Sequence, residues 1–290
     1  MDFTGKVALI TGGGGGIGRA TALGFALRGA KVMVVDADAD SGQASVDIIA
    51  QRGGAAAFVQ ADVTKSASVK DYVEKTLALY GRIDAALRPD AILASSTSGL
   101  IMSEMQAGFR SALRFAVGHP FNPPHLIPLV EVVGGQETAP ETVQWCLAFY
   151  RHIGKKPIHI RKEARGHLAN RLQAALWREA VSAVVTGLAS VEDVDTAISA
   201  GPGLRWAAMG PHMTFHLGGG EGGIEHLLAQ FKPAFESWWE TMSTPELSDE
   251  NCRRIIEGVR AEAAGRSMGD LVQDRDAILL PLLELVSRRF

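Results

Sequence analysis

The sequence predicts an α/β fold in which a doubly wound parallel sheet is followed by an all-α C-terminal domain. Before about residue 164, short apolar runs alternate with segments of helical periodicity, which is typical of crossover units in a parallel sheet. After Gly166 the apolar residues keep helical spacing and no further strand-like run is evident. We therefore expect a sheet domain over residues 1–164 and a helical domain over residues 165–290.

A glycine-rich loop lies in the first crossover unit. An apolar run over residues 6–11 leads into Gly12 to Gly18, a helical pattern covers residues 19–28, and a second apolar run ends at Asp36. Glycines let the backbone approach a pyrophosphate, the helix N-terminus supplies oriented amides, and an acid at the second strand's tip can accept ribose hydroxyls. This order of elements predicts a Rossmann-type dinucleotide site.

Asp36 favours NAD as the cofactor, because a carboxylate repels the 2′-phosphate of NADP and no arginine follows it closely. The pattern Thr-Gly-x-x-x-Gly-Ile-Gly ending at Gly18, with Ala-Asp-Val over residues 61–63, resembles the short-chain dehydrogenase/reductase family over about residues 3–84. The residues expected to bind NAD, with the last two beside the adenine, are Gly12, Gly16, Ile17, Gly18, Asp36, Asp62 and Val63.

The resemblance to that family ends near residue 85. Its catalytic Tyr-x-x-x-Lys pair is absent, because none of Tyr72, Tyr80 and Tyr150 has a lysine four residues later. No strand-like run is evident between residues 63 and 91. Since crossover units add parallel strands without leaving a gap, we expect residues 91–95 to pair directly with residues 6–11.

His119 and Glu131 are the candidate catalytic pair. His119 ends an apolar, strand-like run, which would place its imidazole at the carboxyl edge of the sheet, where open α/β folds bind ligands. Glu131 lies inside the next apolar run. A carboxylate on one ring nitrogen fixes the tautomer and stabilises the imidazolium, which suits a general base near neutral pH. The alternative is a structural histidine that caps a strand beside a glutamate in a surface turn.

The residues around this pair resemble the 3-hydroxyacyl-CoA dehydrogenase superfamily over about residues 86–290. The resemblance rests on His-Pro-Phe-Asn-Pro-Pro over 119–124, Leu-Val-Glu over 129–131, and the runs 94–99 and 166–173. It implies that His119 is the general base and Glu131 its orienting partner, and that Ser98 and Asn170 hydrogen-bond the substrate oxygen and the histidine. It also implies an NAD-dependent oxidoreductase that oxidises the C3 hydroxyl of a 3-hydroxy acid.

Within that superfamily, residues 170–179, 201–206 and 216–223 most resemble the L-carnitine dehydrogenases, which would make L-carnitine the substrate and 3-dehydrocarnitine the product. We interpret residues 201–206 and 210–223 as turns that contact the substrate. Aromatic faces attract a quaternary ammonium group, and an arginine can meet a carboxylate. The residues expected at the substrate are Arg205, Trp206, Phe215 and Trp177; core packing of the rings is the alternative.

Two other functions stay open. One is a 3-hydroxyacyl-CoA dehydrogenase, which would need a basic surface for the phosphates of coenzyme A. The other is a recombined or designed chimera that binds NAD with little or no turnover. It stays open because, with the join near residue 85, neither half keeps all the strands and helices with which its family binds the cofactor.

Composition and charge limit the partners. The chain has 47% apolar residues, a net charge of −3 and no basic run, so neither nucleic acid nor an anionic membrane is expected to bind. The two cysteines fit a reducing compartment, and His212 and His216 lack a third ligand, so no metal is expected. With no signal-like or membrane-spanning run, we expect a cytoplasmic protein, and a homodimer formed through the helical domain.

Overall fold

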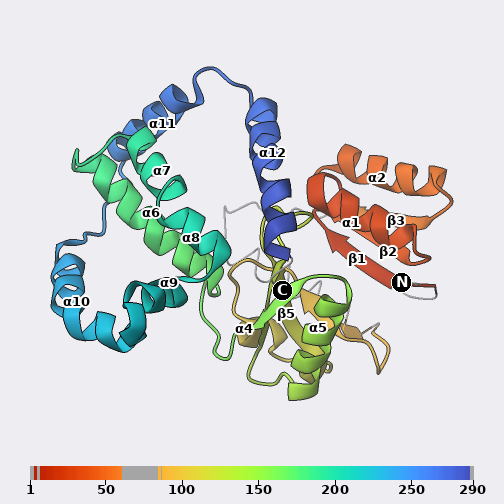
Figure 1. Cartoon of the computed structure of the whole chain (residues 1–290). Helices are drawn as coiled ribbons and strands as arrows, with labels where there is room; N and C mark the ends of the chain where they lie inside the picture. The colour runs from red at the N-terminus through yellow and green to blue at the C-terminus, as the bar shows by residue number, and fades with distance from the viewer. Residues whose placement is uncertain (1–2, 5–6, 61–83, 86, 288–290) are drawn as a thin grey trace. The chain divides into compact units, whose positions relative to one another are not determined.

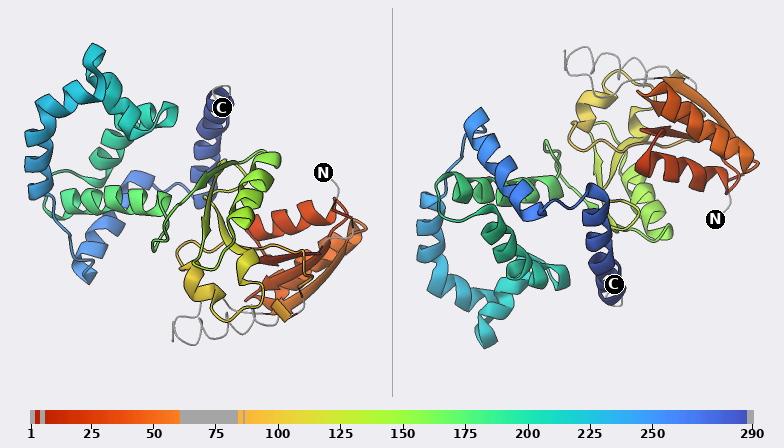
Figure 2. Two further views of the ribbon diagram at one scale, coloured as in Figure 1. Left: turned by 90° about the horizontal axis from the view of Figure 1, so that it is seen from below. Right: turned by 90° about the horizontal axis from the view of Figure 1, so that it is seen from above.

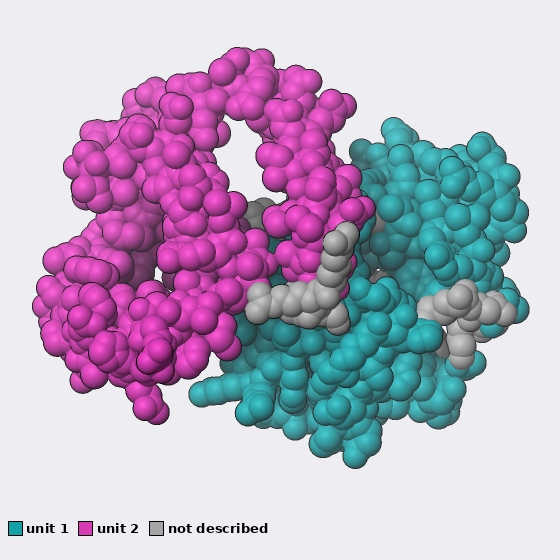
Figure 3. Space-filling view, in the orientation of Figure 1, with its two compact units in different colours: residues 1–168 teal, residues 169–290 magenta. Residues whose placement is uncertain are grey.

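The computed structural model describes residues 3–4, 7–60, 84–85 and 87–287 of the chain. Its contacts divide the chain into two compact units: Met1–Leu168, called unit 1, and Ala169–Phe290, called unit 2 (Figure 3). Unit 1 carries all the described strands, and unit 2 is built from helices (Figure 1). The predicted class, a Rossmann-type α/β part followed by a helical part, is confirmed.

The first sheet of unit 1 has three parallel strands in the order β1-β2-β3. They are β1 (Val7–Thr11), β2 (Lys31–Asp36) and β3 (Ala55–Gln60), connected in part by helices α1 (Gly16–Ala26) and α2 (Ala39–Gln51). The two helices lie along this sheet in both views of Figure 2. The predicted order of strand, glycine loop, helix and acid-tipped strand is therefore confirmed.

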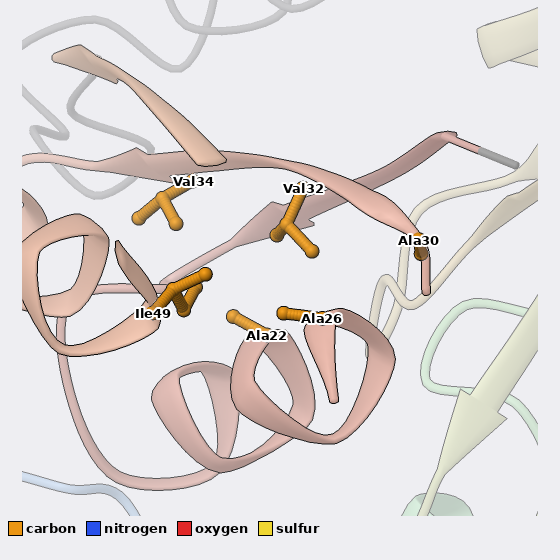
Figure 4. Close-up of a cluster of buried hydrophobic side chains, with 6 residues drawn as sticks. All are labelled: Ala22, Ala26, Ala30, Val32, Val34 and Ile49. Carbon is orange, nitrogen blue, oxygen red and sulfur yellow. The ribbon is translucent and has the colours of Figure 1, made fainter. Parts of the chain in front are cut away.

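A small apolar core joins these helices to β2 (Figure 4). Ala22 and Ala26 of α1 face Val32 and Val34 of β2, and Ile49 of α2 closes the same cluster. Val32 and Val34 are two residues apart, so they point to one face of the sheet. Alanine side chains let α1 approach that face closely, which brings the start of α1 next to the end of β1.

The second sheet of unit 1 has the order β4-β5-β6-β7. Its strands are β4 (Leu93–Ser95), β5 (Phe115–Pro120), β6 (Leu129–Gly134) and β7 (Lys156–His159). The pairs β4·β5 and β6·β7 are parallel, but β5·β6 is antiparallel. The expectation of a purely parallel sheet was wrong here. Residues 121–128 carry no helix, and so short a connection suits a reversal of direction rather than a crossover.

The predicted pairing of residues 91–95 with residues 6–11 was also wrong. In the described part of the chain, β1 and β4 belong to different sheets. β4 is only three residues long, and it already pairs with β5. So short a strand can form only a few backbone hydrogen bonds with a second neighbour, so pairing with β1 would gain little stability. The expected absence of a strand between residues 63 and 91 falls mostly outside the described residues.

Helices cover both faces of β5. On one face α5 (Pro140–His152) packs its Val143, Cys146 and Leu147 against Ala116 of β5 and against Val130 and Val132 of β6. On the other face α4 (Met102–Gln106) packs its methionines against Phe115 and Val117. A short 3₁₀ turn, η2 (Ala112–Arg114), leads into β5. Because β5 is buried on both faces, its position within unit 1 is fixed by packing as well as by hydrogen bonds.

Unit 2 is helical throughout its regular structure. Its helices are α6 (Ala169–Val185), α7 (Val191–Ser199), α8 (Pro202–Ala208), α9 (Pro211–Gly218), η3 (Gly220–Gly222), α10 (Gly223–Thr241), α11 (Asp249–Ala263) and α12 (Met268–Ser287). The last two helices, α11 and α12, agree with the helical spacing expected after Gly166. The turns predicted over 201–206 and 210–223 are mostly short helices. Helices α8 and α9 each begin with a proline after a glycine, and proline is well suited to the first helical position.

Within the described residues, the structure shows no helix with both the length and the apolar character needed to cross a membrane.

Candidate active site

His119 and Glu131 face each other across the antiparallel strands β5 and β6, as directly opposed residues. The Nδ1 atom of His119 lies 2.8 Å from the Oε2 atom of Glu131. His119 is 5% exposed and Glu131 is fully buried. Opposed residues on one sheet face have adjacent Cβ atoms, so the strand register brings these side chains together. The structure thus joins the two residues that the sequence singled out.

The second carboxylate oxygen of Glu131 is also occupied. The backbone N–H of Leu168 donates to Oε1 at 2.8 Å. A buried carboxylate needs such donors, because an ionised group without partners is costly away from water. With Glu131 as the acceptor for Nδ1–H, the Nε2 atom of His119 is the ring nitrogen that can take a proton. The arrangement has the chemistry of a base with an orienting acid.

The other two predicted catalytic residues lie in different units. Ser98 is exposed in the turn that follows β4. Thr97 shapes this turn, because its Oγ1 accepts hydrogen bonds from the N–H groups of Gly99 and Leu100. Asn170 is the second residue of α6 and so belongs to unit 2. Contact of Ser98 or Asn170 with a substrate stays a prediction.

Three further residues, which the sequence did not single out, support the pair of His119 and Glu131. The Tyr150 hydroxyl lies 3.5 Å from the Gly118 carbonyl, and burial raises the pKa of this phenol above its usual value. Lys155 donates to the carbonyls of Pro124 and Ile127, and partial burial lowers the pKa of its ammonium group. These two residues hold the strand before His119 and the proline-rich segment after it.

The third missed residue is His167, whose side chain is buried with 2% exposure. Its Nε2 lies 3.0 Å from the Thr97 carbonyl oxygen, and its ring centroid lies 5.3 Å from that of His119. The signal in the sequence is a histidine directly after Gly166, just past the predicted end of the sheet domain.

The glycine loop is built to let a phosphate approach its backbone. Gly12 and Gly16 have φ values of +64° and +45°, which favour glycine over residues with side chains. A Cβ on Gly18 would lie 2.0 Å from the Gly12 carbonyl oxygen, so the start of α1 packs too closely for any side chain there. Ile17 follows Gly16 in the first turn of α1. The backbone of this loop fits the pyrophosphate of a dinucleotide.

Asp36 lies at the end of β2 and contacts the loop. Its Oδ2 accepts from the Gly14 N–H at 2.7 Å, and its Oδ1 accepts from the Asp38 N–H at 3.0 Å. Each carboxylate oxygen can accept more than one hydrogen bond, which leaves capacity for ribose hydroxyls. The predicted adenine contacts, Asp62 and Val63, lie outside the described residues.

The predicted substrate residues belong to three helices of unit 2. Trp177 lies in α6 and is 51% exposed, whereas Arg205 and Trp206 lie in α8, with Trp206 39% exposed. Phe215 of α9 packs edge to face against Phe235 of α10, at a centroid distance of 5.3 Å. This contact favours a structural role for the Phe215 ring.

His212 and His216, which are spaced four residues apart, lie in α9. The Nδ1 atom of His216 accepts a hydrogen bond from the Ile224 N–H at 3.1 Å, and this ties α9 to α10. In the portion of the chain described, no three His, Cys, Asp or Glu side chains gather as metal ligands would.

Family models cover both units. The model of the 3-hydroxyacyl-CoA dehydrogenase NAD-binding domain matches residues 49–164, and the model of that enzyme's C-terminal domain matches residues 166–256. A KR domain model matches residues 6–89. The change of match along the chain agrees with the change of resemblance seen near residue 85.

Curated relatives and solved structures agree with these matches. L-carnitine dehydrogenase of Nocardiopsis dassonvillei is 45% identical over 84% of this chain and 73% of its own length. That of Streptomyces coelicolor is 49% identical over 72% of this chain and 66% of its own length. The structure of an NAD+-dependent 5-formyl-3-hydroxy-2-methylpyridine 4-carboxylic acid 5-dehydrogenase gives a TM-score of 0.71 at 24% identity, covering 98% of this chain and 97% of its own.

The chain thus spans 66% of the length of the Streptomyces coelicolor relative and 73% of the length of the Nocardiopsis dassonvillei relative. A 3-hydroxyacyl-CoA dehydrogenase of Archaeoglobus fulgidus, at 21% identity, shares the fold with a TM-score of 0.63, covering 97% of this chain and 99% of its own. Two family models match consecutive parts of the chain, and these relatives are more than 40% identical to it. The chain therefore belongs to the 3-hydroxyacyl-CoA dehydrogenase family, whose cofactor is NAD.

Proposed function

We propose that this protein is an NAD-dependent dehydrogenase that oxidises the C3 hydroxyl of L-carnitine to give 3-dehydrocarnitine. The observation that carries the proposal is the buried pair of His119 and Glu131, joined at 2.8 Å in a chain similar to L-carnitine dehydrogenases. The pair supplies a base, and the glycine loop with Asp36 supplies a cradle for the dinucleotide.

In this mechanism the Nε2 atom of His119 removes the proton of the C3 hydroxyl. The glycine loop and Asp36 would hold NAD, which would supply the hydride acceptor that turns the C3 alcohol into a ketone. Glu131 stabilises the imidazolium that forms, because its carboxylate already accepts the Nδ1–H hydrogen bond. Ser98 and Asn170 would hydrogen-bond the reacting oxygen and the histidine, and the imidazolium then releases its proton to solvent.

The remaining predicted residues would bind the two ends of the substrate. Trp177 and Trp206 have exposed ring surface that can receive the quaternary ammonium group, an attraction of about 0.5–2 kcal/mol per contact. Arg205 is exposed in the same helix as Trp206 and would meet the carboxylate. Phe215 is retained as a weaker candidate because Phe235 already covers one side of its ring. Ribose hydroxyls would bind Asp36, while Asp62 and Val63 would flank the adenine.

A direct assay tests the function. The purified protein would be supplied with NAD and either L-carnitine or 3-hydroxybutyryl-CoA, and NADH formation would be followed. We expect oxidation of L-carnitine, and Trp206→Ala should weaken it while Trp145→Ala, at an exposed tryptophan of unit 1, should not. Oxidation of the CoA ester alone would reject the carnitine proposal. Calorimetric binding of NAD without any turnover would support a chimera that binds the cofactor only.

We further propose a homodimer that associates through unit 2. Trp238 and Trp239 of α10 are 54% and 65% exposed, and such large exposed rings are typical of association surfaces. Light scattering should give twice the chain mass, and Trp238→Ser with Trp239→Ser should lower it. A wild-type mass equal to one chain would contradict the dimer.

We also propose a cytoplasmic location, and a boundary near residue 164 between the NAD-binding sheet domain and the helical domain. The location is supported by the free cysteines Cys146 and Cys252, and the boundary by the two compact units that meet at Leu168. Fractionation of the source cells tests the location, and cleavage near residues 160–170 by limited proteolysis tests the boundary.

A further inference from the structure

His167 is a buried polar residue to which the proposed mechanism gives no role. It lies in unit 1 between Gly166 and Leu168, and both Gly166 and His167 have positive φ values, of 77° and 53°. A residue with a side chain rarely adopts this left-handed conformation. The two successive residues form a tight turn, in which the His167 N–H donates to the Ala164 carbonyl at 3.0 Å.

The side chain of His167 holds the turn that carries Ser98. Its Nε2 lies 3.0 Å from the Thr97 carbonyl oxygen, and a carbonyl only accepts, so this nitrogen must carry the proton. Thr97 in turn accepts the N–H groups of Gly99 and Leu100 on its Oγ1. The His167 imidazole is therefore hydrogen-bonded to Thr97, the first residue of the turn that contains Ser98.

The backbone at His167 also holds the catalytic pair. The turn presents the N–H of the next residue, Leu168, to Glu131 Oε1 at 2.8 Å, while Glu131 Oε2 binds His119. The rings of His167 and His119 are tilted by 47° at a centroid distance of 5.3 Å. Two adjacent residues thus connect the Ser98 turn to the His119–Glu131 pair.

We propose that His167 is a positioning residue that keeps the Ser98 turn in register with the His119–Glu131 pair. The inference rests on the proposed function, in which Ser98 binds the substrate oxygen that His119 deprotonates. Small misplacements of reacting groups are costly in such steps, so the hydrogen bond to Thr97 would affect turnover more than folding. The alternative is a core histidine whose hydrogen bond matters only for stability.

Two substitutions of similar length separate these roles. His167→Gln keeps an N–H donor at the end of the side chain, whereas His167→Met fills similar space without a donor. Neither glutamine nor methionine is branched at Cβ, so both should have a similar conformational cost at the positive φ of residue 167. We expect Met to lower kcat by about 10-fold or more, because the partly buried Thr97 carbonyl loses its donor, with NAD affinity unchanged. Gln should recover most of that loss, and His152→Met, at an exposed histidine, serves as the control.

Proton NMR gives a readout that does not need turnover. The Nδ1 proton of His119, bonded to Glu131, should resonate far downfield, and His167→Met should shift or broaden it while His167→Gln should not. In a double-mutant cycle, Met should add little to Ser98→Ala, since both act through one turn. If the wild type oxidises no 3-hydroxy acid, the proposed function fails and the NMR result alone decides the inference. An unchanged resonance in the folded Met variant, or equal kcat loss in Gln and Met, would overturn it.

Discussion

Tyr150 leaves no room for a side chain on Gly118, the residue before the catalytic histidine. A Cβ placed on Gly118 would lie 2.1 Å from the Tyr150 hydroxyl oxygen and 2.6 Å from two ring carbons. Tyr150 extends from α5 and Gly118 lies in β5, so this contact sets how closely helix and strand approach. The position of His119 therefore depends on a packing contact on the neighbouring residue.

The substitution Gly118→Ala should both destabilise the protein and slow turnover. Overpacking of this kind costs about 1–3 kcal/mol, and the displaced strand would move the His119 ring. Urea unfolding gives the free energy change, and steady-state kinetics give the loss of kcat. Gly269→Ala in α12 is a suitable control, because an added Cβ there has only the Ser267 Oγ atom within 4 Å, at 3.6 Å. If Gly118→Ala matched the control in both measurements, the contact would have no role.

Removing the base should abolish most activity. His119→Ala should lower kcat by at least about 100-fold, the usual contribution of a positioned general base, with NAD affinity nearly unchanged. The measurement pairs turnover of L-carnitine with calorimetric binding of NAD. Near-normal activity in a folded His119→Ala protein would show that another group acts as the base.

The orienting acid should matter less than the base. Glu131→Gln keeps an oxygen that can accept from His119, but it removes the negative charge that stabilises the imidazolium. We expect a smaller fall in kcat than for His119→Ala, of about 10-fold or more. The side-chain amide can also place its NH₂ group toward the Leu168 N–H, so Glu131→Asp is needed as a second variant that keeps the charge. Equal losses in Gln and Asp would point to geometry rather than charge.

How much of this site was predictable depends on the distance over which each contact acts in the sequence. His119 and Glu131 could be paired because each lies in an apolar strand of its own, and the short proline-rich segment returns one beside the other. The contacts of His167 with Thr97 and of Tyr150 with Gly118 are set by helix and loop packing, which periodicity does not encode.

The fold was predictable in class but not in every pairing. The predicted pairing of β4 with β1 was wrong because the rule of gapless parallel sheets does not hold for a strand of only three residues. The helices over 202–218 were missed because their prolines and glycines were interpreted as turn residues, although proline starts each helix.

Asp36 should set the choice of cofactor. Its carboxylate faces the loop through Gly14 and would repel a 2′-phosphate, so the unmutated protein should bind NAD more tightly than NADP. Asp36→Ala should narrow that difference. It should also weaken NAD binding, since the Gly14 and Asp38 N–H groups lose their acceptor. Calorimetry with both dinucleotides checks this, with Asp40→Ala on the exposed start of α2 as the control. Equal affinity of the wild type for both would exclude the role.

Asp84 should stabilise the segment that leads into β5. It is 7% exposed, and its carboxylate accepts the N–H groups of Arg110 and Ser111 at 2.8 and 2.9 Å. Burial by itself would raise the pKa of Asp84, but the hydrogen bonds from Ser111 and Arg110 outweigh it and hold the pKa of this carboxyl below its usual value. A carboxyl group with a depressed pKa in the folded state stabilises the protein above its unfolded-state pKa. That contribution is lost as pH falls from about 4 through the folded-state pKa.

Asp84→Asn should therefore lower the free energy of unfolding at pH 7 by about 1–3 kcal/mol, because the amide can accept through only one of its two end atoms. The difference between wild type and variant should shrink as pH falls below about 4, where the wild-type carboxyl becomes protonated. Urea unfolding at several pH values measures both effects. Asp90→Asn is the matched control, since Asp90 is largely exposed and pairs only with the exposed Arg88 in the described contacts. A pH-independent difference for Asp84→Asn would mean that shape, and not charge, makes this residue important.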